Sequence, residues 1–251
     1  MIGWLIYSAV DVEKNKYYIQ MYKDKFKEHF IEIKLVIVEE LENMEQYVKC
    51  NKVDFAINRS RNHIMGELLE QKGVRVFNSS SVTRIANNKG ITYEFLKDVV
   101  PFLAVKYGNE IIESKIENKG FEYPYVIKSC SGHGGSQVFL VNNSKEEEQA
   151  VKAMNGQEYV VQQCCSDLGR DVRVYIIGNK IIKAVLRTST ESFKSNYSLG
   201  GKVQEYTLNN EEKAMVERIV DKLPLDYAEF FFDLRKLYPN IILSIIESTD
   251  E

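Results

Sequence analysis

The chain has few of the residues that build zinc sites and disulfide frameworks. It contains four cysteines and three histidines among 251 residues. No Cys-x-x-Cys spacing, the usual mark of a zinc site, occurs among Cys50, Cys130, Cys164 and Cys165. We therefore expect that the protein has no zinc site and that its thiols are reduced. His29 and His63 suit surface or packing positions, whereas His133 is a candidate for chemistry because it lies in a glycine-rich loop.

The sequence also lacks an excess of positive charge and any long apolar run. The 33 basic and 36 acidic side chains give a formal net charge of −3, so the basic field that non-specific nucleic-acid binding needs is absent. No apolar stretch approaches the ~20 residues that span a bilayer. The apolar start, residues 1–8, has no basic flank and is followed by Asp11 and Glu13, which favours a buried strand over a signal peptide. We expect a cytoplasmic protein with no nucleic-acid or membrane partner.

A hydrophobic content of 44% is enough for a substantial core. Residues 1–82 alternate between strand and helix patterns, which predicts a small parallel α/β lobe. Strands are expected at 4–8, 33–38, 53–57 and 74–77, and helices at 13–30, 40–49 and 63–72. Four aromatic residues at helical spacing predict one buried helix face: Tyr18, Tyr22, Phe26 and Phe30.

The remaining chain predicts two α+β lobes, at 83–156 and 157–251. The first has expected helices at 89–98, 111–119 and 144–154, the last opening with a capping box at Ser144, and expected strands at 103–106 and on both sides of a glycine-rich loop. The second begins with a strand at 158–164. A hairpin at 171–187 turns at Gly178-Asn179, and a helix at 211–223 precedes strands at 227–234 and 241–247.

The segment 125–141 is the most informative one. It places Lys128 at the end of a strand, just before a loop containing Gly132, Gly134 and Gly135. Missing Cβ atoms let backbone N–H groups approach an anion closely, so this loop fits a triphosphate. Neither the P-loop nor the dinucleotide-binding glycine pattern is present. A glycine-rich hairpin without a ligand is the alternative interpretation.

Charged residues on the predicted hairpin at 171–187 form a second candidate site. Asp171, Arg173 and Arg187 lie among valines and isoleucines on strands expected to be half buried, where charges need a partner or a ligand. Asp171 and Arg173 alternatively form an exposed alternating face. Arg187 suits phosphate because a guanidinium binds it through two parallel hydrogen bonds.

The order and spacing of these segments resemble the ATP-grasp carboxylate–amine ligases, and within them the RimK-like glutamate ligases. The resemblance runs from about Val76 to Glu247 and is strongest over 161–180, 184–187 and 193–201. It implies an ATP-grasp fold of class α/β (α+β), in which a small N-terminal parallel α/β lobe precedes two α+β lobes that clamp ATP.

The resemblance also implies roles for individual residues. ATP binding is implied for two lysines, the glycine loop, the inter-lobe hinge and a residue near the ribose: Lys89, Lys128, Ser131, Gly132, His133, Gly134, Gly135, Ser136, Gln162, Gln163, Cys164, Cys165 and Asp171. Catalytic roles around the γ-phosphate and the acyl-phosphate are implied for Arg173, Arg187 and Asn196, and a turn facing the substrate for Gly200 and Gly201. Asn88 stands where the family has an aspartate.

The metal site departs from the family pattern. Asp233 and Glu247 are the candidate ligands for Mg²⁺ or Mn²⁺, but Phe231 and Thr249 stand where the family has aspartate and asparagine. Asp233 alternatively caps a strand end. The chain also ends at residue 251, where relatives usually continue with a substrate-closing loop, so Asp250 and Glu251 are possible substitutes.

The function implied is ATP-dependent formation of an amide or peptide bond through an acyl-phosphate. The expected substrates are a small-molecule carboxylate, such as an amino acid, and an amine or peptide acceptor. A catalytically eroded ATP-binding module and a small-molecule kinase are the alternatives, and a homo-oligomer stays open. Arg59 and Arg61 either recognise a substrate carboxylate or belong to a solvated loop.

Overall fold

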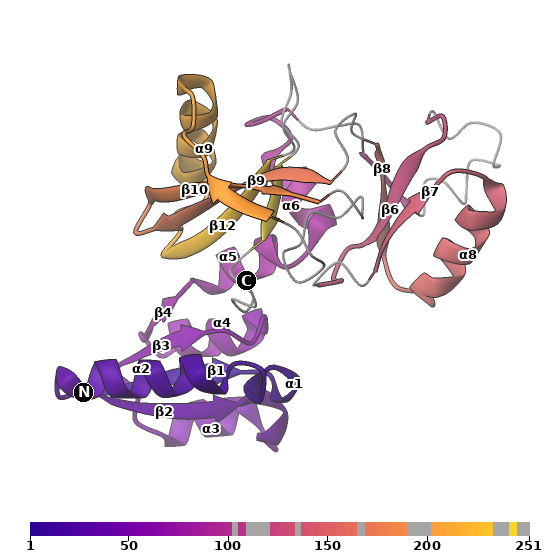
Figure 1. The fold of residues 1–251 in the computed structure, drawn as a ribbon. Coiled ribbons are helices and arrows are strands. Elements are labelled where there is room, and N and C mark those ends of the chain that lie inside the picture. Colours follow the sequence, from indigo (N-terminus) through magenta and orange to yellow (C-terminus); the bar gives the residue numbers. More distant parts are fainter. Residues whose placement is uncertain are drawn as a thin grey trace.

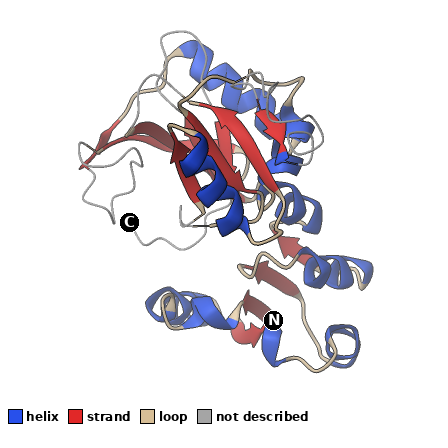
Figure 2. Ribbon diagram, turned by 90° about the vertical axis from the view of Figure 1, so that its right-hand side faces the viewer, coloured by secondary structure: helices blue, strands red, loops and turns tan. Residues whose placement is uncertain are grey.

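The computed structural model describes residues 1–101, 105–108, 121–133, 137–164, 169–189, 202–232 and 241–244. This part of the chain forms three sheets that follow one another in the sequence, here called the first, middle and last sheet (Figure 1). Seen from the side, the first sheet and its helices lie below the other two sheets (Figure 2). No described helix is long and apolar enough to cross a membrane.

The first sheet is parallel and has the order β2-β1-β3-β4. Its strands are β1 (Ile2–Tyr7), β2 (Glu32–Ile37), β3 (Phe55–Asn58) and β4 (Arg75–Phe77), and the segments between them are α1 (Ala9–Val12), α2 (Lys16–Glu28), η1 (Val38–Glu40), α3 (Met44–Cys50) and α4 (His63–Gln71). Successive β1 residues enter two different clusters, with Trp4 and Ile6 in one and Leu5 and Tyr7 in the other. Both faces of β1 are therefore buried, as in other parallel sheets covered by helices.

The prediction that Phe30 is a core residue is wrong. Helix α2 ends at Glu28, and Phe30 has a φ of 59° and is 95% exposed. Tyr22 and Phe26 do pack against the core because they lie inside the helix. The four-residue spacing places side chains on one face only as far as the helix continues.

The middle sheet is antiparallel and has the order β5-β8-β6-β7. Its strands are β5 (Val105–Tyr107), β6 (Tyr125–Ser129), β7 (Val138–Val141) and β8 (Tyr159–Gln163). Helix α8 (Ser144–Met154) covers one face, and its N-cap is Asn143, whose side chain accepts a hydrogen bond from the Glu146 backbone N–H at 3.1 Å. The predicted cap at Ser144 is therefore one residue late. The helix predicted at 111–119 lies outside the described residues.

The sequence-based boundary at 156/157 assigns β8 to the last lobe, whereas β8 pairs with β5 and β6 in the middle sheet. Conversely, α5 (Ser80–Ala86) and α6 (Lys89–Leu96) precede the middle sheet in sequence but pack on the last one. Local patterns predict the elements but not their long-range partners. The helix α5 was not predicted at all.

The last sheet is antiparallel, with the order β11-β10-β9-β12-β13. Its strands are β9 (Arg170–Ile177), β10 (Lys180–Thr188), β11 (Lys202–Glu205), β12 (Tyr227–Phe232) and β13 (Ile241–Ser244), and its helix is α9 (Asn210–Lys222). The predicted β9–β10 hairpin is confirmed, with positive φ at Gly178 and Asn179. Asn209 caps α9 in a full capping box with Glu212.

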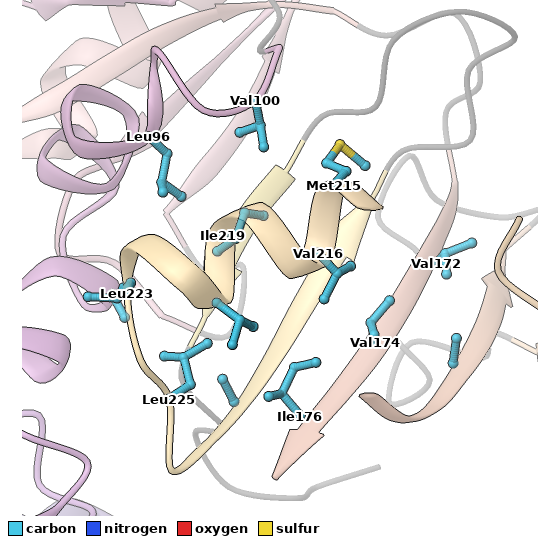
Figure 3. Close-up of a cluster of buried hydrophobic side chains, with 14 of the residues drawn as sticks. Leu96, Val100, Val172, Val174, Ile176, Met215, Val216, Ile219, Leu223 and Leu225 are labelled. Carbon is cyan, nitrogen blue, oxygen red and sulfur yellow. The ribbon is translucent and has the colours of Figure 1, made fainter. Parts of the chain in front are cut away.

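The largest buried cluster lies between α9 and the last sheet. Met215, Val216 and Ile219 of α9 face β9 and its neighbours, and Leu96 and Val100 lie beside them (Figure 3). On β9 the side chains in contact with this cluster are those of Val172, Val174 and Ile176, which alternate with polar residues (Figure 3). The alternation gives the last sheet one apolar face and one polar face.

Asn78 joins the first sheet to the last one. Its side chain is 1% exposed, donates to the Tyr227 carbonyl at 2.8 Å and accepts from the N–H groups of Asp226 and Tyr227 at 2.8 and 3.2 Å. Arg75 adds an ion pair with Asp226, and the Tyr227 hydroxyl donates to the Asn58 carbonyl at 3.0 Å. The first lobe is therefore tied to the start of β12 by directional bonds.

Replacing Asn78 with alanine should lower the free energy of unfolding by about 2–4 kcal/mol, because buried backbone groups at 226 and 227 lose their partners. Urea unfolding measures this change. Asn87→Ala is a matched control, since the Asn87 side chain donates to the Thr83 carbonyl of the helix that it caps. Equal losses in the two variants would contradict the joining role of Asn78.

Candidate functional site

The middle and last sheets each have one face packed under a helix, α8 or α9, and polar side chains on the other face. On the middle sheet that other face also carries Val160, which packs against Tyr93 of α6. Helices α8 and α9 lie at opposite outer sides of this pair of sheets, so the faces opposite to them are the inner ones (Figure 1). On β6, Tyr125 and Ile127 pack in the cluster under α8, which places Lys128 on the opposite face by alternation. On β9, alternation likewise places Asp171 and Arg173 opposite α9. The predicted phosphate-binding side chains are thus on the two inner faces.

Lys128 is held by a buried amide. The side chain is 7% exposed, and its Nζ donates to Oε1 of Gln162 at 2.6 Å. Gln162 comes from β8, which pairs directly with β6, and is 2% exposed. The Gln162 Nε2 atom is buried and has no hydrogen-bond partner among the described residues. This amide donor is available for an acceptor on a ligand.

Gln162 and Gln163 differ in which face of β8 their side chains occupy. Both were predicted to lie on the hinge, but successive strand residues point to opposite faces, and only Gln162 shares the face of Lys128. Gln163 is exposed and Cys164 is partly exposed at the end of the strand. The structure therefore brings Gln162, rather than Gln163, to the lysine side chain.

Asp171 and Arg187 form a buried two-point ion pair in the last sheet. The Arg187 Nε and Nη2 atoms donate to Oδ1 and Oδ2 of Asp171, each at 2.8 Å. The two residues are directly opposite each other in the β9–β10 register, and they are 9% and 4% exposed. The alternative of an exposed alternating face is wrong for Asp171. Arg173 is half-buried on the same face, opposite Val185.

Lys89 contacts the beginning of the glycine loop. It is the first residue of α6, its backbone N–H donates to the Cys130 carbonyl at 2.9 Å, and its Nζ donates to the Gly132 carbonyl. A Cβ on Gly132 would lie 2.8 Å from Oε1 of Gln137 and 3.0 Å from Cβ of Ser129. Glycine at 132 therefore allows close packing as well as the approach of a ligand. Ser131 is exposed and His133 is half-buried.

The buried Cys130 is not activated as a nucleophile. Burial raises the pKa of the Cys130 thiol, which keeps it protonated at neutral pH. Cys50 and Cys130 are free thiols. No group of three or more metal-ligating side chains occurs within the part of the chain that the structure describes.

Nine predicted site residues lie outside the described residues. They belong to the glycine loop, the hinge, the segment after β10 and the metal site: Gly134, Gly135, Ser136, Cys165, Asn196, Gly200, Gly201, Asp233 and Glu247. Their roles stay predictions.

Sequence reasoning missed the contacts that fix the site residues. The Lys128–Gln162 bond joins residues 34 positions apart, and the Asp171–Arg187 bond depends on the hairpin register. The hairpin turn at Gly178-Asn179 was a usable signal for the second contact, since it makes 171 and 187 cross-strand neighbours. No local signal existed for the first.

Comparison with known proteins decides the family. A model of the RimK-like ATP-grasp domain matches residues 78–236, more than half of the chain. The chain belongs to the RimK-like ATP-grasp family. This confirms the family and the fold that the motifs indicated. Proteins of this family are ATP-dependent carboxylate–amine ligases.

Two similar sequences come from Mycoplasma and Vibrio species. The chain is 30% identical to "Uncharacterized protein MG011" of Mycoplasma genitalium, over 94% of this chain and 80% of that protein. It is 28% identical to a "Probable alpha-L-glutamate ligase" of Vibrio parahaemolyticus, over 71% of this chain and 52% of that protein.

Two solved structures share the fold. A RimK domain ATP-grasp protein from Sphaerobacter thermophilus has a TM-score of 0.76 at 19% identity, over 100% of this chain and 93% of that one. A D-alanine–D-alanine ligase from Bacillus anthracis, complexed with ATP, has a TM-score of 0.75 at 15% identity, over 98% and 86% of the two chains.

Replacing Asp171 with alanine should lower the free energy of unfolding by roughly 3–5 kcal/mol, because Arg187 is left buried without its counter-charge. The double variant Asp171→Val/Arg187→Leu removes both charges and should recover most of the loss. Urea unfolding of the single and double variants measures the coupling. A single-variant loss of no more than about 1 kcal/mol would show that the pair is not a structural element.

Proposed function

We propose that this chain is an ATP-dependent ligase that joins a carboxylate to an amine. The observation that carries the proposal is the pair of inner faces, on which Lys128 and Arg187 are each held by a buried partner. Such preorganised cations stabilise the charge that develops during phosphoryl transfer without having to reorganise. The buried Gln162 Nε2 and the position of Lys89 against the glycine loop fit ATP as the nucleotide.

The proposed reaction has two steps. An oxygen of the substrate carboxylate attacks the γ-phosphorus, the bond to the β–γ bridging oxygen breaks, and ADP leaves. The amine nitrogen then attacks the carbonyl carbon of the acyl-phosphate, inorganic phosphate leaves, and the nitrogen loses a proton. Exclusion of water between the two sheets protects the acyl-phosphate from hydrolysis.

The roles that we propose for the described residues follow from the sheet on which each residue lies. Lys89 and Lys128, on the side of the middle sheet, are proposed to bind the phosphates, and Gln162 the nucleotide at the hinge. Arg173 and Arg187, on the last sheet, are proposed to bind the transferred phosphoryl group. Asp171 orients Arg187 through two hydrogen bonds and is proposed to lie near the ribose.

Glutamate is the proposed amino-acid substrate. The support is the name of the Vibrio relative, an alpha-L-glutamate ligase, which this chain resembles over 71% of its length. The proposed cofactor is Mg²⁺, with Asp233 and Glu247 as ligands, because hard carboxylate oxygens suit this ion and ATP phosphates complete its coordination.

Lys128→Ala should weaken ATP binding about 10–100-fold, the usual loss for a charge-assisted hydrogen bond. Calorimetric titration of ATP in the presence of Mg²⁺ measures the change. Lys152→Ala, at an exposed position on α8, is the matched control and should bind ATP like the unmodified protein. Unchanged binding in Lys128→Ala, or no binding by the unmodified protein, would contradict the proposed nucleotide site.

Release of ADP in the presence of glutamate and an amine acceptor should require Mg²⁺ and should fall at least about tenfold in Glu247→Gln. A coupled ADP assay with and without a chelator measures this. If ATP affinity is the same with and without Mg²⁺ and no ADP is released, the protein is instead an eroded ATP-binding module. In that case Phe231→Asp together with Thr249→Asn should increase the metal dependence of ATP affinity.

A further inference from the structure

Arg59 lies in a loop whose backbone is fixed. The loop follows β3, and the Arg59 N–H donates to the Ile6 carbonyl at 2.8 Å, which continues the β1–β3 pairing beyond the strand. The Asn58 side chain accepts from the Ser60 N–H and hydroxyl at 3.0 and 2.7 Å and donates to the Asn62 carbonyl at 2.9 Å. The backbone position of Arg59 is therefore set by an ordered turn.

Three phenols surround Arg59. Its guanidinium carbon lies 5.6 Å from the centre of the Tyr227 ring. Tyr7 and Tyr22 are the other side chains that affect the pKa of the guanidinium. Burial acts to lower its pKa, but Tyr227, Tyr7 and Tyr22 outweigh this and leave the pKa raised. Burial also raises the pKa of Tyr227 to about 12, so this phenol is neutral at physiological pH. The side chain is partly exposed, so a ligand can reach it.

No carboxylate pairs with Arg59 among the described residues. Two other arginines with restricted exposure each have an aspartate partner: Arg61 with Asp11 at 2.9 Å, and Arg187 with Asp171 at 2.8 Å. Arg61 is only two residues from Arg59 in the same loop. The half-buried Arg59 guanidinium lies among neutral phenols, so no counter-charge from the described residues compensates it. The charge of Arg61 is compensated by Asp11.

The position of Arg59 fits a substrate. Ligands of open α/β sheets bind beyond the carboxyl ends of the strands, where the loops after β1 and β3 lie. Tyr227 begins β12 opposite Ile177, and Phe231, further along β12, is opposite Arg173. Arg59 lies against Tyr227 at the start of this strand, so it is placed to bind a group of the substrate other than the one that reacts.

We propose that Arg59, with Tyr7, Tyr22 and Tyr227, is a binding site for a substrate carboxylate that is not consumed in the reaction. This inference rests on the proposed ligase function and extends it to the substrate class. The substrate then carries at least two anionic groups or is an extended amino acid or peptide with a free carboxylate. A guanidinium, with donors arranged as a planar fork, binds such a group through two parallel hydrogen bonds.

The test compares carboxylates with their amides. L-Glutamate, L-glutamine and L-isoglutamine are titrated calorimetrically into the protein, with and without ATP and Mg²⁺. We expect the unmodified protein to bind glutamate at least about tenfold more tightly than one of the two amides, because each amide lacks one carboxylate. We expect Arg59→Gln to lose this preference, Arg59→Lys to keep part of it, and Arg61→Gln to keep all of it.

A purely structural Arg59 gives a different pattern. Arg59→Gln would then lower the unfolding temperature while keeping the preference for glutamate, and this result would overturn the proposal. Loss of the preference in Arg61→Gln as well, or no glutamate binding by the unmodified protein, would also overturn it. ATP binding is measured in the same titrations, so failure of the nucleotide site is seen separately from failure of the carboxylate site.

Discussion

The alternation of side chains along the strands of the two antiparallel sheets is the constraint on which the rest of the molecule depends. Every second residue of β6 and β9 packs under α8 or α9, and the residues between them are presented on the opposite face. A one-residue shift of either strand would move Lys128 or Asp171 into an apolar cluster. The packing of two hydrophobic cores therefore fixes which charged groups face the space between the sheets.

The joint between the first and last sheets places a second set of groups. Asn78 bonds both the N–H and the carbonyl of Tyr227, and Tyr227 in turn bonds the Asn58 carbonyl. The start of β12 is thus attached to the loop that carries Arg59. Because β12 is also hydrogen-bonded to β9, the loop of the first lobe and the arginines of the last sheet belong to one connected framework.

Sequence reasoning was strongest where structure is local. The β9–β10 hairpin followed from Gly178-Asn179, because turn geometry depends on neighbouring residues. It was weaker where distant segments meet. The assignment of β8 to the middle sheet needs its hydrogen bonds to β5 and β6, and the helix α5 begins within a serine-rich stretch that also fits a linker. The lysine, glycine-loop and arginine series predicted the site residues, but not that Gln162 holds Lys128 or that Asp171 holds Arg187.

The arginines of this protein show why partners matter more than residue type. Burying a charge is costly, and a counter-charge at hydrogen-bond distance offsets that cost while fixing the geometry of both groups. The Asp11–Arg61 and Asp171–Arg187 pairs follow this rule and hold a loop and a sheet, whereas Arg75, which pairs with Asp226 at the lobe junction, is exposed. At Arg59 neutral tyrosines replace the aspartate, so the surroundings position the guanidinium without cancelling its charge. A structural role for Arg59 would be served better by an acidic partner, which would stabilise the buried charge further. Recognition of an external carboxylate instead requires a positioned guanidinium whose charge has no partner within the protein.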